Sequence, residues 1–333
     1  MKRELQDPLK ILVTGSRGKS SLVRLIHSAL VANGIKAYGR ITGVLPRELT
    51  PAGEVQILRT NGGHVEEMRW WLSSLPHYAE AVVMENSAVA PELQHLAAAW
   101  LSPQVTVITK VDPDHQEAWG PSEEDAIRAI ALGVTGEGSV FMGPGLDKKI
   151  YLMDILKSKG CSLHTTSLPE GSSPDFRENN ILTALGICRY LGMDIELSEK
   201  AIRGTPPDMA DFRTFPLGET ELAFAFSAND IDSTRDLFGM LGWSSDETIL
   251  LYNHRRDRPV RLESYRDWMF SNKWSSVFIT GDRPWFAWAW KWYRESKDLG
   301  ELLSSFGEAR KIFGCGNVAG LPLDFILERE ELQ

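Results

Sequence analysis

The segment with the clearest chemical signal is VTGSRGKSS, residues 13 to 21, in which glycines, a lysine and hydroxyl side chains follow one another closely. Backbone N–H groups of such a turn, together with the positive end of a following helix, can converge on a polyphosphate. Lys19 can then reach the outer phosphates, and Ser20 can present its hydroxyl to Mg²⁺. The GxxxxGK[ST] pattern requires a glycine where Val13 stands, whereas here the first glycine is Gly15. The segment predicts a shortened nucleotide loop; a glycine-rich turn before an ordinary helix is the alternative.

Two later segments place metal-ligand chemistry directly after apolar runs. Glu85 follows the run from Ala79 to Met84, and the segment TKVDPDHQEAWGP follows another run, Val105 to Val111. The second segment contains Asp112, Asp114, His115 and Glu117. Mg²⁺ prefers oxygen ligands and usually takes only one or two from a protein. We therefore expect a metal site beside the phosphate loop, the alternatives being a solvated glutamate and a histidine that caps a helix.

The elements that must position these residues are predicted by apolar periodicity. Strand-length apolar runs alternate with helix-length segments along the chain, which indicates doubly wound α/β architecture with a parallel sheet. Expected strands in the first half are 10–14, 35–42, 79–84, 105–111 and 139–142; expected helices are 20–33, ended by Gly34, 122–133, with a Ser122/Asp125 capping box, and 180–191. Because parallel strands end at one edge, the loop, Glu85 and His115 should converge there.

A domain boundary is expected at GTPPDM, residues 204 to 209, because two prolines neither continue a helix nor join a central strand. This divides the chain into domains 1–205 and 206–333. Beyond the boundary the alternation restarts, with strands at 222–226, 248–252, 277–280 and 311–313 and helices at 233–241, from 262, and up to 330. The second half therefore predicts a smaller α/β domain.

Composition limits the classes of partner. The 333 residues include 36 Lys plus Arg against 45 Asp plus Glu, a net charge of −9, which gives no reason to expect nucleic acid or an anionic membrane. There is no apolar stretch of membrane-spanning length and no signal peptide, so we expect a cytoplasmic protein. The 3 cysteines lack disulfide or zinc-ligand spacing. An anionic substrate would need a local basic site.

The loop TGSRGKSS resembles the phosphate loops of Mur-type ligases, which make amide bonds with ATP. With Arg17 in the variable position it is most similar to the ligase subunits of poly-γ-glutamate (capsule) synthases. Ordered motifs extend the resemblance from Ile11 to about Glu328, without the amino-terminal membrane segment of those subunits or the UDP-binding domain of Mur enzymes. The resemblance implies a Mur-type central P-loop ATPase domain with a parallel sheet and a smaller Rossmann-like C-terminal domain that closes over the active site.

The resemblance also implies roles for individual residues. Those expected to bind the nucleotide are Gly15, Ser16, Arg17, Gly18, Lys19, Ser20, Ser21, Asn180, Arg213 and Asn229. Asn180 corresponds to the family's adenine contact, although a helix cap is its simpler role, and Arg213 corresponds to an arginine that contacts phosphate. Magnesium ligands would be Ser20, Glu85 and His115, the histidine serving a second ion. Catalytic roles are expected for Lys19, His115, Arg213 and Asp230.

Two further motifs of the second half resemble capsule-ligase segments. YNHRRDRPVR carries Asn253, Arg255 and Arg258, and IFGCGNVAG carries Asn317. Each follows an expected strand, so arginines gather at the carboxyl edge of the second sheet. They could attract a carboxylate or phosphate despite the net charge of −9.

The segment RPWFAWAWKWYRES, residues 283 to 296, is rich in tryptophan. Pro284 suits the first turn of a helix, and Trp285, Trp288 and Trp292 would then share one face. The pattern favours a helix packed on the second sheet. The alternative is a docking surface for a membrane protein or for a second copy of the chain.

Taken with the resemblance, these residues predict a carbon–nitrogen ligase that uses ATP and Mg²⁺. It would join a carboxylate, glutamate or a related amino acid or peptide, to an amine through an acyl phosphate, with release of ADP and phosphate. Two alternatives remain open: a P-loop kinase or NTPase acting on a small anionic substrate, and a nucleotide-gated scaffold that docks a membrane partner through its tryptophans.

Overall fold

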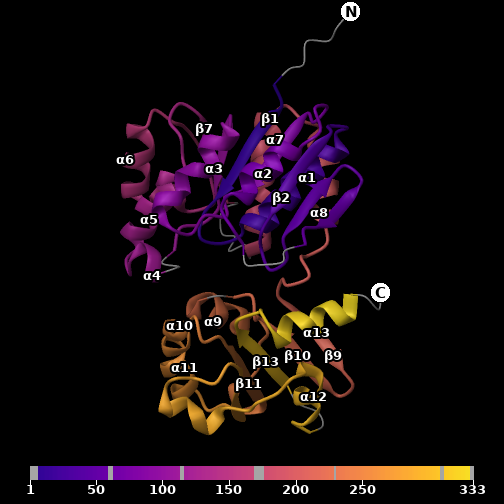
Figure 1. The fold of residues 1–333 in the computed structure, drawn as a ribbon, viewed down its shortest axis with the longest axis vertical. Helices are drawn as coiled ribbons and strands as arrows, with labels where there is room; N and C mark the ends of the chain where they lie inside the picture. The colour runs from indigo at the N-terminus through magenta and orange to yellow at the C-terminus, as the bar shows by residue number, and fades with distance from the viewer. Residues whose placement is uncertain are drawn as a thin grey trace, which may run out of the picture. The chain divides into compact units, whose positions relative to one another are not determined.

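The chain folds into two compact units, residues 1–206 and 207–333, each built around one β-sheet (Figure 1). The computed structural model describes residues 7–58, 63–112, 116–168, 176–228, 230–307 and 311–330. Helices alternate with strands in both units, so the predicted α/β class is confirmed. No helix within these ranges combines the length and the apolar character needed to cross a bilayer.

The N-terminal unit contains an eight-stranded sheet in the order β4-β3-β2-β5-β1-β6-β7-β8. The strands are β1 Leu9–Thr14, β2 Ala37–Ile41, β3 Arg47–Thr50, β4 Gly53–Gln56, β5 Ala81–Glu85, β6 Val105–Ile108, β7 Ser139–Met142 and β8 Ser162–Thr165. The β2–β3 and β3–β4 pairs are antiparallel, and the other pairs are parallel. β1 lies between β5 and β6, so the ends of these three strands adjoin where open α/β sheets place their ligands.

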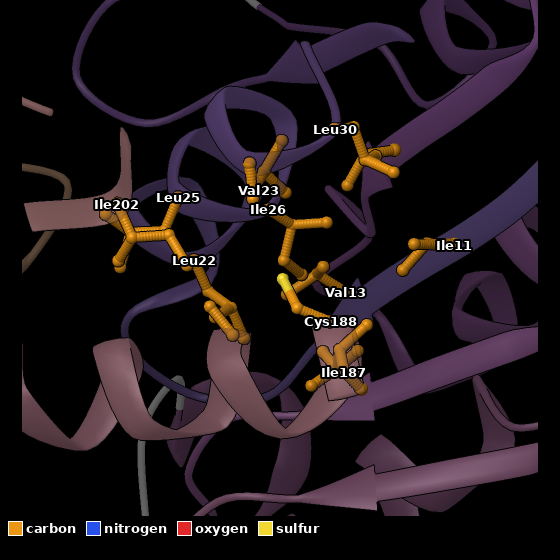
Figure 2. Close-up of a cluster of buried hydrophobic side chains, with 14 of the residues drawn as sticks. Ile11, Val13, Leu22, Val23, Leu25, Ile26, Leu30, Ile187, Cys188 and Ile202 are labelled. Atoms are coloured by element: carbon orange, nitrogen blue, oxygen red, sulfur yellow. The ribbon is translucent and has the colours of Figure 1, made fainter. Parts of the chain in front are cut away.

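Helices cover both faces of this sheet (Figure 1). They are α1 Lys19–Ala32, α2 Glu67–Ser74, α3 Gln94–Leu101, α4 Gln116–Trp119, α5 Glu123–Leu132, α6 Ile150–Ser158, α7 Phe176–Tyr190 and α8 Ile195–Gly204, with short 3₁₀ turns at Pro91–Leu93 and Leu146–Lys148. Ile11 and Val13 of β1 pack with α1, α7 and α8 on one face (Figure 2). Leu12 packs with α2 and α3 on the other face, which explains the continuous apolar run of β1. Both bonds of the predicted Ser122/Asp125 capping box form at the start of α5.

The C-terminal unit contains a five-stranded sheet in the order β12-β11-β13-β10-β9. Its elements are β9 Arg213–Leu217, β10 Thr220–Phe224, α9 Ile231–Met240, β11 Thr248–His254, α10 Pro259–Ser264, α11 Arg266–Ser271, β12 Ser276–Gly281, α12 Leu299–Ser304, β13 Lys311–Gly316 and α13 Leu321–Glu330, with 3₁₀ turns at Ser245–Glu247 and Ala287–Trp292. Only the β9–β10 pair of this sheet is antiparallel. Its core includes the fully buried Tyr252, Tyr265 and Phe313.

The tryptophan-rich segment does not form the predicted α-helix with three tryptophans on one face. It forms a 3₁₀ helix over Ala287–Trp292, so Trp285 lies outside the helix and is 72% exposed. Trp288 and Trp292 instead pack against Phe270, with ring centroids 5.8 and 4.9 Å away. The helix ends because the chain after it returns to the sheet as extended backbone, where Arg294 N–H donates to the carbonyl of Ile279 in β12 at 2.8 Å.

Candidate nucleotide and metal site

The phosphate loop leaves β1 through a turn that only glycine can occupy. Gly15 has φ +131°, and a Cβ added there would lie 2.3 Å from the Thr109 hydroxyl and 2.9 Å from the carbonyl of Lys110. Ser16 N–H donates to that same carbonyl at 2.9 Å. Because β1 extends to Thr14, the position of Val13 belongs to the buried strand and needs no glycine. The shortened loop is therefore pressed against the segment that follows β6.

Side chains from the loop and its neighbours hold this conformation. The Lys19 ammonium donates to the carbonyl of Gly15 at 2.7 Å, and Ser16 Oγ accepts from the N–H of Asp112 at 3.1 Å. From α7, the Asn180 amide donates to the carbonyl of Gly18 at 3.4 Å. Gly18 has φ +78° and immediately precedes α1, so the loop opens onto the N-terminus of a helix. This is the backbone arrangement that suits a polyphosphate.

Two of the three predicted metal ligands lie together beside the loop. Ser20 Oγ donates to Glu85 Oε2 at 2.8 Å, and the same oxygen accepts from the N–H of Thr42 at 2.9 Å. Glu85 is the last residue of β5 and is only 5% exposed. A Cβ at Gly43 would lie 3.0 Å from Ser20 Oγ, so the chain after β2 also closes on this pair. A hydroxyl and a carboxylate are the oxygen donors that Mg²⁺ or Mn²⁺ accepts, and these residues fit such an ion.

Two of the expected metal and nucleotide residues, His115 and Asn229, lie outside the described residues, as does Asp114. The carboxylate of Asp112 pairs with Lys110 at 2.6 Å. Within the described ranges, no group of three or more His, Cys, Asp or Glu side chains gathers at one point. Among the described residues, the Ser20–Glu85 pair therefore remains the candidate for a metal site.

In the C-terminal unit, Arg213 and Asp230 have local structural partners. Arg213 is the first residue of β9, and its guanidinium lies 5.0 Å from the ring centroid of Phe215. Asp230 caps α9, since its carboxylate accepts from the N–H of Ser233 at 2.7 Å. Its carbonyl accepts from the hydroxyl of Tyr265 at 3.0 Å. These contacts fix both residues within this unit.

The predicted motifs at the carboxyl edge of the second sheet are joined by hydrogen bonds. Asn253 donates to the carbonyl of Asn317 at 2.6 Å, and Arg261 donates to the Asn317 side chain at 2.7 Å. Arg255 instead pairs with Asp257 at 2.7 Å. Burial lowers the pKa of His254, which follows Asn253 in β11 and is 2% exposed. The edge is therefore a prearranged polar surface that carries several guanidinium groups.

Three residues that the sequence reasoning did not single out help to shape the site: Thr42, Gly43 and Thr109. Thr109 contacts Gly15, and its hydroxyl donates to the carbonyl of Arg17. All three stand just beyond the ends of strands adjacent to β1 or β5. The signal that could have revealed Thr42 and Thr109 was a hydroxyl side chain near the carboxyl end of an expected strand, 35–42 or 105–111.

Two family models match the chain. The Mur ligase middle domain matches residues 13–183, more than half of the 333-residue chain, and the poly-gamma-glutamate synthase CapB C-terminal domain matches residues 211–332. The chain belongs to the Mur ligase family. It is accordingly an ATP-dependent ligase, and the resemblance carried by the loop and its accompanying motifs is confirmed.

Two curated relatives match over nearly the whole chain. PGA synthase CapB of Bacillus subtilis (strain 168) is 25% identical in a gapped alignment of length 354, which covers 94% of this chain and 88% of the relative. Capsule biosynthesis protein CapB of Bacillus anthracis is 25% identical in a gapped alignment of length 370, which covers 99% of this chain and 78% of the relative.

Solved structures of similar fold include Mur ligases and folate-related synthases. E. coli FolC in complex with DHPP and ADP has a TM-score of 0.70 at 16% identity, covering 98% of this chain and 90% of its own. The folylpolyglutamate synthase/dihydrofolate synthase from Yersinia pestis, complexed with AMPPNP and Mn ion, has a TM-score of 0.69 at 15% sequence identity, and the match covers 97% of this chain and 89% of that one. MurF from Acinetobacter baumannii has a TM-score of 0.64 at 13% sequence identity, and the match covers 98% of this chain and 77% of that one. At these identities the likeness establishes the fold of this Mur ligase family member.

Proposed function

We propose that this ligase joins a carboxylate, glutamate or a related amino acid or peptide, to an amine, using ATP and Mg²⁺. The observation that carries the proposal is the hydrogen bond from Ser20 to the buried carboxylate of Glu85 beside the Gly15–Ser21 loop. It is supported by the relatives named as PGA synthase and by solved structures of similar fold that hold ADP, or AMPPNP with manganese. In this proposal, residues 1–205 form the nucleotide domain and residues 206–333 form the second domain.

The proposed roles follow from the chemistry of each side chain. Lys19 and Arg213 hold phosphate oxygens and stabilise the charge that develops during transfer. Ser20 and Glu85 hold Mg²⁺, which neutralises phosphate charge when it is bound. His115 supports a second ion. Asn180 and Asn229 contribute to nucleotide binding, and Asp230 has a catalytic role.

The proposed reaction has two steps, formation of an acyl phosphate and its capture by the amine. A carboxylate oxygen of the acid attacks the γ-phosphorus of ATP, the bond to the β-phosphate oxygen breaks, and ADP leaves. The amine then attacks the carbonyl carbon of the acyl phosphate, the carbon–oxygen bond to phosphate breaks, and the nitrogen loses a proton. The products are an amide, ADP and inorganic phosphate. The expected substrate is anionic, which suits a protein that binds it through lysine and arginine.

Measurement of ADP release over a panel of acids crossed with amines tests this proposal. We expect ADP release above background only when an acid and an amine are both present, and a mass spectrum should show the amide formed from glutamate, ATP and Mg²⁺. A kinase would release ADP with one substrate and give a phosphorylated product, whereas an NTPase would need only water. Nucleotide binding without turnover under all combinations would support a scaffold and contradict the ligase.

A further inference from the structure

The last two residues of the N-terminal unit are hydrogen-bonded to the two helices that border the nucleotide loop. The carbonyl of Pro206 accepts from Arg24 of α1 at 2.9 Å, and the carbonyl of Thr205 accepts from Arg177 of α7 at 2.7 Å. The hydroxyl of Thr205 also donates to Ser28 of α1 at 2.9 Å. The point at which the chain leaves this unit is therefore held by side chains from α1 and α7.

These side chains share helix faces with residues of the loop site. Ser20, Arg24 and Ser28 follow one another at intervals of four residues in α1, so they form one stripe along the helix. Ser20 contacts Glu85 at one end of the stripe, and Ser28 contacts Thr205 at the other. On α7, Arg177 lies one turn before Asn180, whose amide donates to the carbonyl of Gly18. Both helices thus connect the loop to the exit of the chain.

The guanidinium of Arg24 is held in one position by its hydrogen-bond partners. Its side chain is only 8% exposed, and its Nε pairs with Glu54 Oε1 at 2.7 Å, while the other oxygen of Glu54 pairs with Arg47 at 2.7 Å. A buried ion pair is an inefficient source of stability, because apolar residues of similar volume often stabilise as well or better. A guanidinium fixed between a carboxylate and a backbone carbonyl instead determines position and direction.

The exit itself is stiff. Thr205 is extended, with φ −66° and ψ 120°, which is the conformation that a residue before proline prefers. Pro206 and Pro207 follow, and each proline ring fixes its own φ. The exit therefore has fewer free backbone torsions with which to absorb a shift of α1 or α7.

We propose that Arg24 and Arg177 are positioning residues that couple nucleotide binding at the loop to the chain segment leaving the N-terminal unit. Nucleotide and metal engage Ser20 and the N-terminus of α1, and the stripe passes the resulting adjustment to residues 205–207. The kinetic consequence rests on the proposed ligase function. The coupling itself requires only nucleotide binding.

The kinetic test uses Arg177→Ala, Arg177→Lys and a control, Arg203→Ala. Arg203 is half exposed on α8 and pairs with Glu178 and Glu199, without a hydrogen bond to the exit. We expect Arg177→Ala to lower kcat for amide formation about tenfold, with KM for ATP and the Kd for AMPPNP within about twofold of wild type. Arg177→Lys, which can still donate to the carbonyl of Thr205, should restore most of kcat. Unchanged kcat in Arg177→Ala, or failure of lysine to rescue it, would overturn the positioning role.

Hydrogen exchange tests the coupling independently of the ligase reaction. In the wild-type full chain, AMPPNP with Mg²⁺ should slow amide exchange of residues 208–213 about threefold or more, and Arg177→Ala should abolish that protection. If Arg177→Ala does not fold, Thr205→Val takes its place, because it removes the hydroxyl bonds to Ser28 and to the carbonyl of Ala201 and leaves Arg177 intact. Exchange that does not respond to AMPPNP in the wild type would refute the coupling. A wild type that shows protection but forms no amide would refute only the proposed function.

Discussion

At the residue scale, the candidate metal site depends on one carboxylate oxygen. Glu85 Oε2 accepts two hydrogen bonds, from Ser20 and from the backbone of Thr42, in a place almost closed to solvent. A carboxylate that is oriented in advance in this way can bind a cation without reorganising. The arrangement therefore predicts that the charge of Glu85, rather than its volume, matters for the reaction.

We expect Glu85→Gln to lower kcat for amide formation about 100-fold or more, because a neutral amide is a far weaker ligand for a hard cation. Circular dichroism should show an unchanged fold, since glutamine can still accept from Ser20. The matched control is Glu80→Gln, just before the start of the same strand, where the carboxylate accepts from the N–H of Lys36. Amide formation at the wild-type rate in Glu85→Gln would contradict the metal assignment.

A second prediction at the residue scale concerns Gly15, where an added Cβ would be opposed both by the positive φ and by close neighbours. A control glycine with a positive φ but no close neighbours separates these two effects. Gly53 has a comparable positive φ, +140°, but a Cβ there would meet nothing within 4 Å. Gly53→Ala should therefore lower the unfolding free energy by only about 1–3 kcal/mol, the cost of the backbone conformation alone. Gly15→Ala should cost more and also weaken AMPPNP binding at least tenfold, because Thr109 and Lys110 must move.

Urea unfolding and AMPPNP titration of the two glycine variants measure these effects. If both variants lose the same unfolding free energy and keep the wild-type affinity for AMPPNP, the close approach of the loop to the segment after β6 is not important for nucleotide binding.

At the scale of elements, the sequence predicted those whose apolar pattern was strong. β1, β5 and β6 are continuous buried runs, and α1 starts directly after the glycine loop, so their positions and the convergence of the loop with Glu85 could be predicted. The β3–β4 hairpin could not, because β4 is exposed along its whole length and has no alternation that distinguishes it from a loop.

The prediction of an α-helix in the tryptophan-rich segment was wrong for a different reason. A tryptophan spacing of three and four residues indicates a helix, but it cannot reveal that the following residues return to β12 as extended backbone. That return is a long-range contact, which local periodicity does not contain. The same limit applies to Thr42 and Thr109, whose importance arises from neighbouring strands that are distant in sequence.

The observed 3₁₀ segment predicts unequal roles for its tryptophans. Trp288 packs on Phe270 and donates its indole N–H to Glu263 at 3.1 Å, whereas Trp285 is 72% exposed. Trp288→Ala should lower the unfolding free energy by about 3 kcal/mol, and Trp285→Ala by less than about 0.5 kcal/mol. Chemical denaturation measures both, and equal effects would contradict the packing described here.

At the scale of the whole molecule, two compact units with separate hydrophobic cores predict two unfolding transitions. AMPPNP with Mg²⁺ should raise the transition of the N-terminal unit, which contains the loop, by mass action. Phe313→Ala, in the core of the C-terminal unit, should lower the other transition, because it leaves a cavity. Scanning calorimetry tests this, and one transition that shifts as a whole under both changes would contradict it.

The tryptophan cluster of the C-terminal unit has a spectroscopic consequence. Most of the 11 tryptophans lie in that unit, and α1 and α7, beside the phosphate loop, contain none. Four tryptophans nevertheless lie in the N-terminal unit, and Trp119 ends α4 in the segment that follows the loop's neighbour β6, so wild-type emission would also respond locally to nucleotide. In a variant with phenylalanine at Trp70, Trp71, Trp100 and Trp119, a change in tryptophan fluorescence on adding AMPPNP would record an effect on the C-terminal unit without any introduced label.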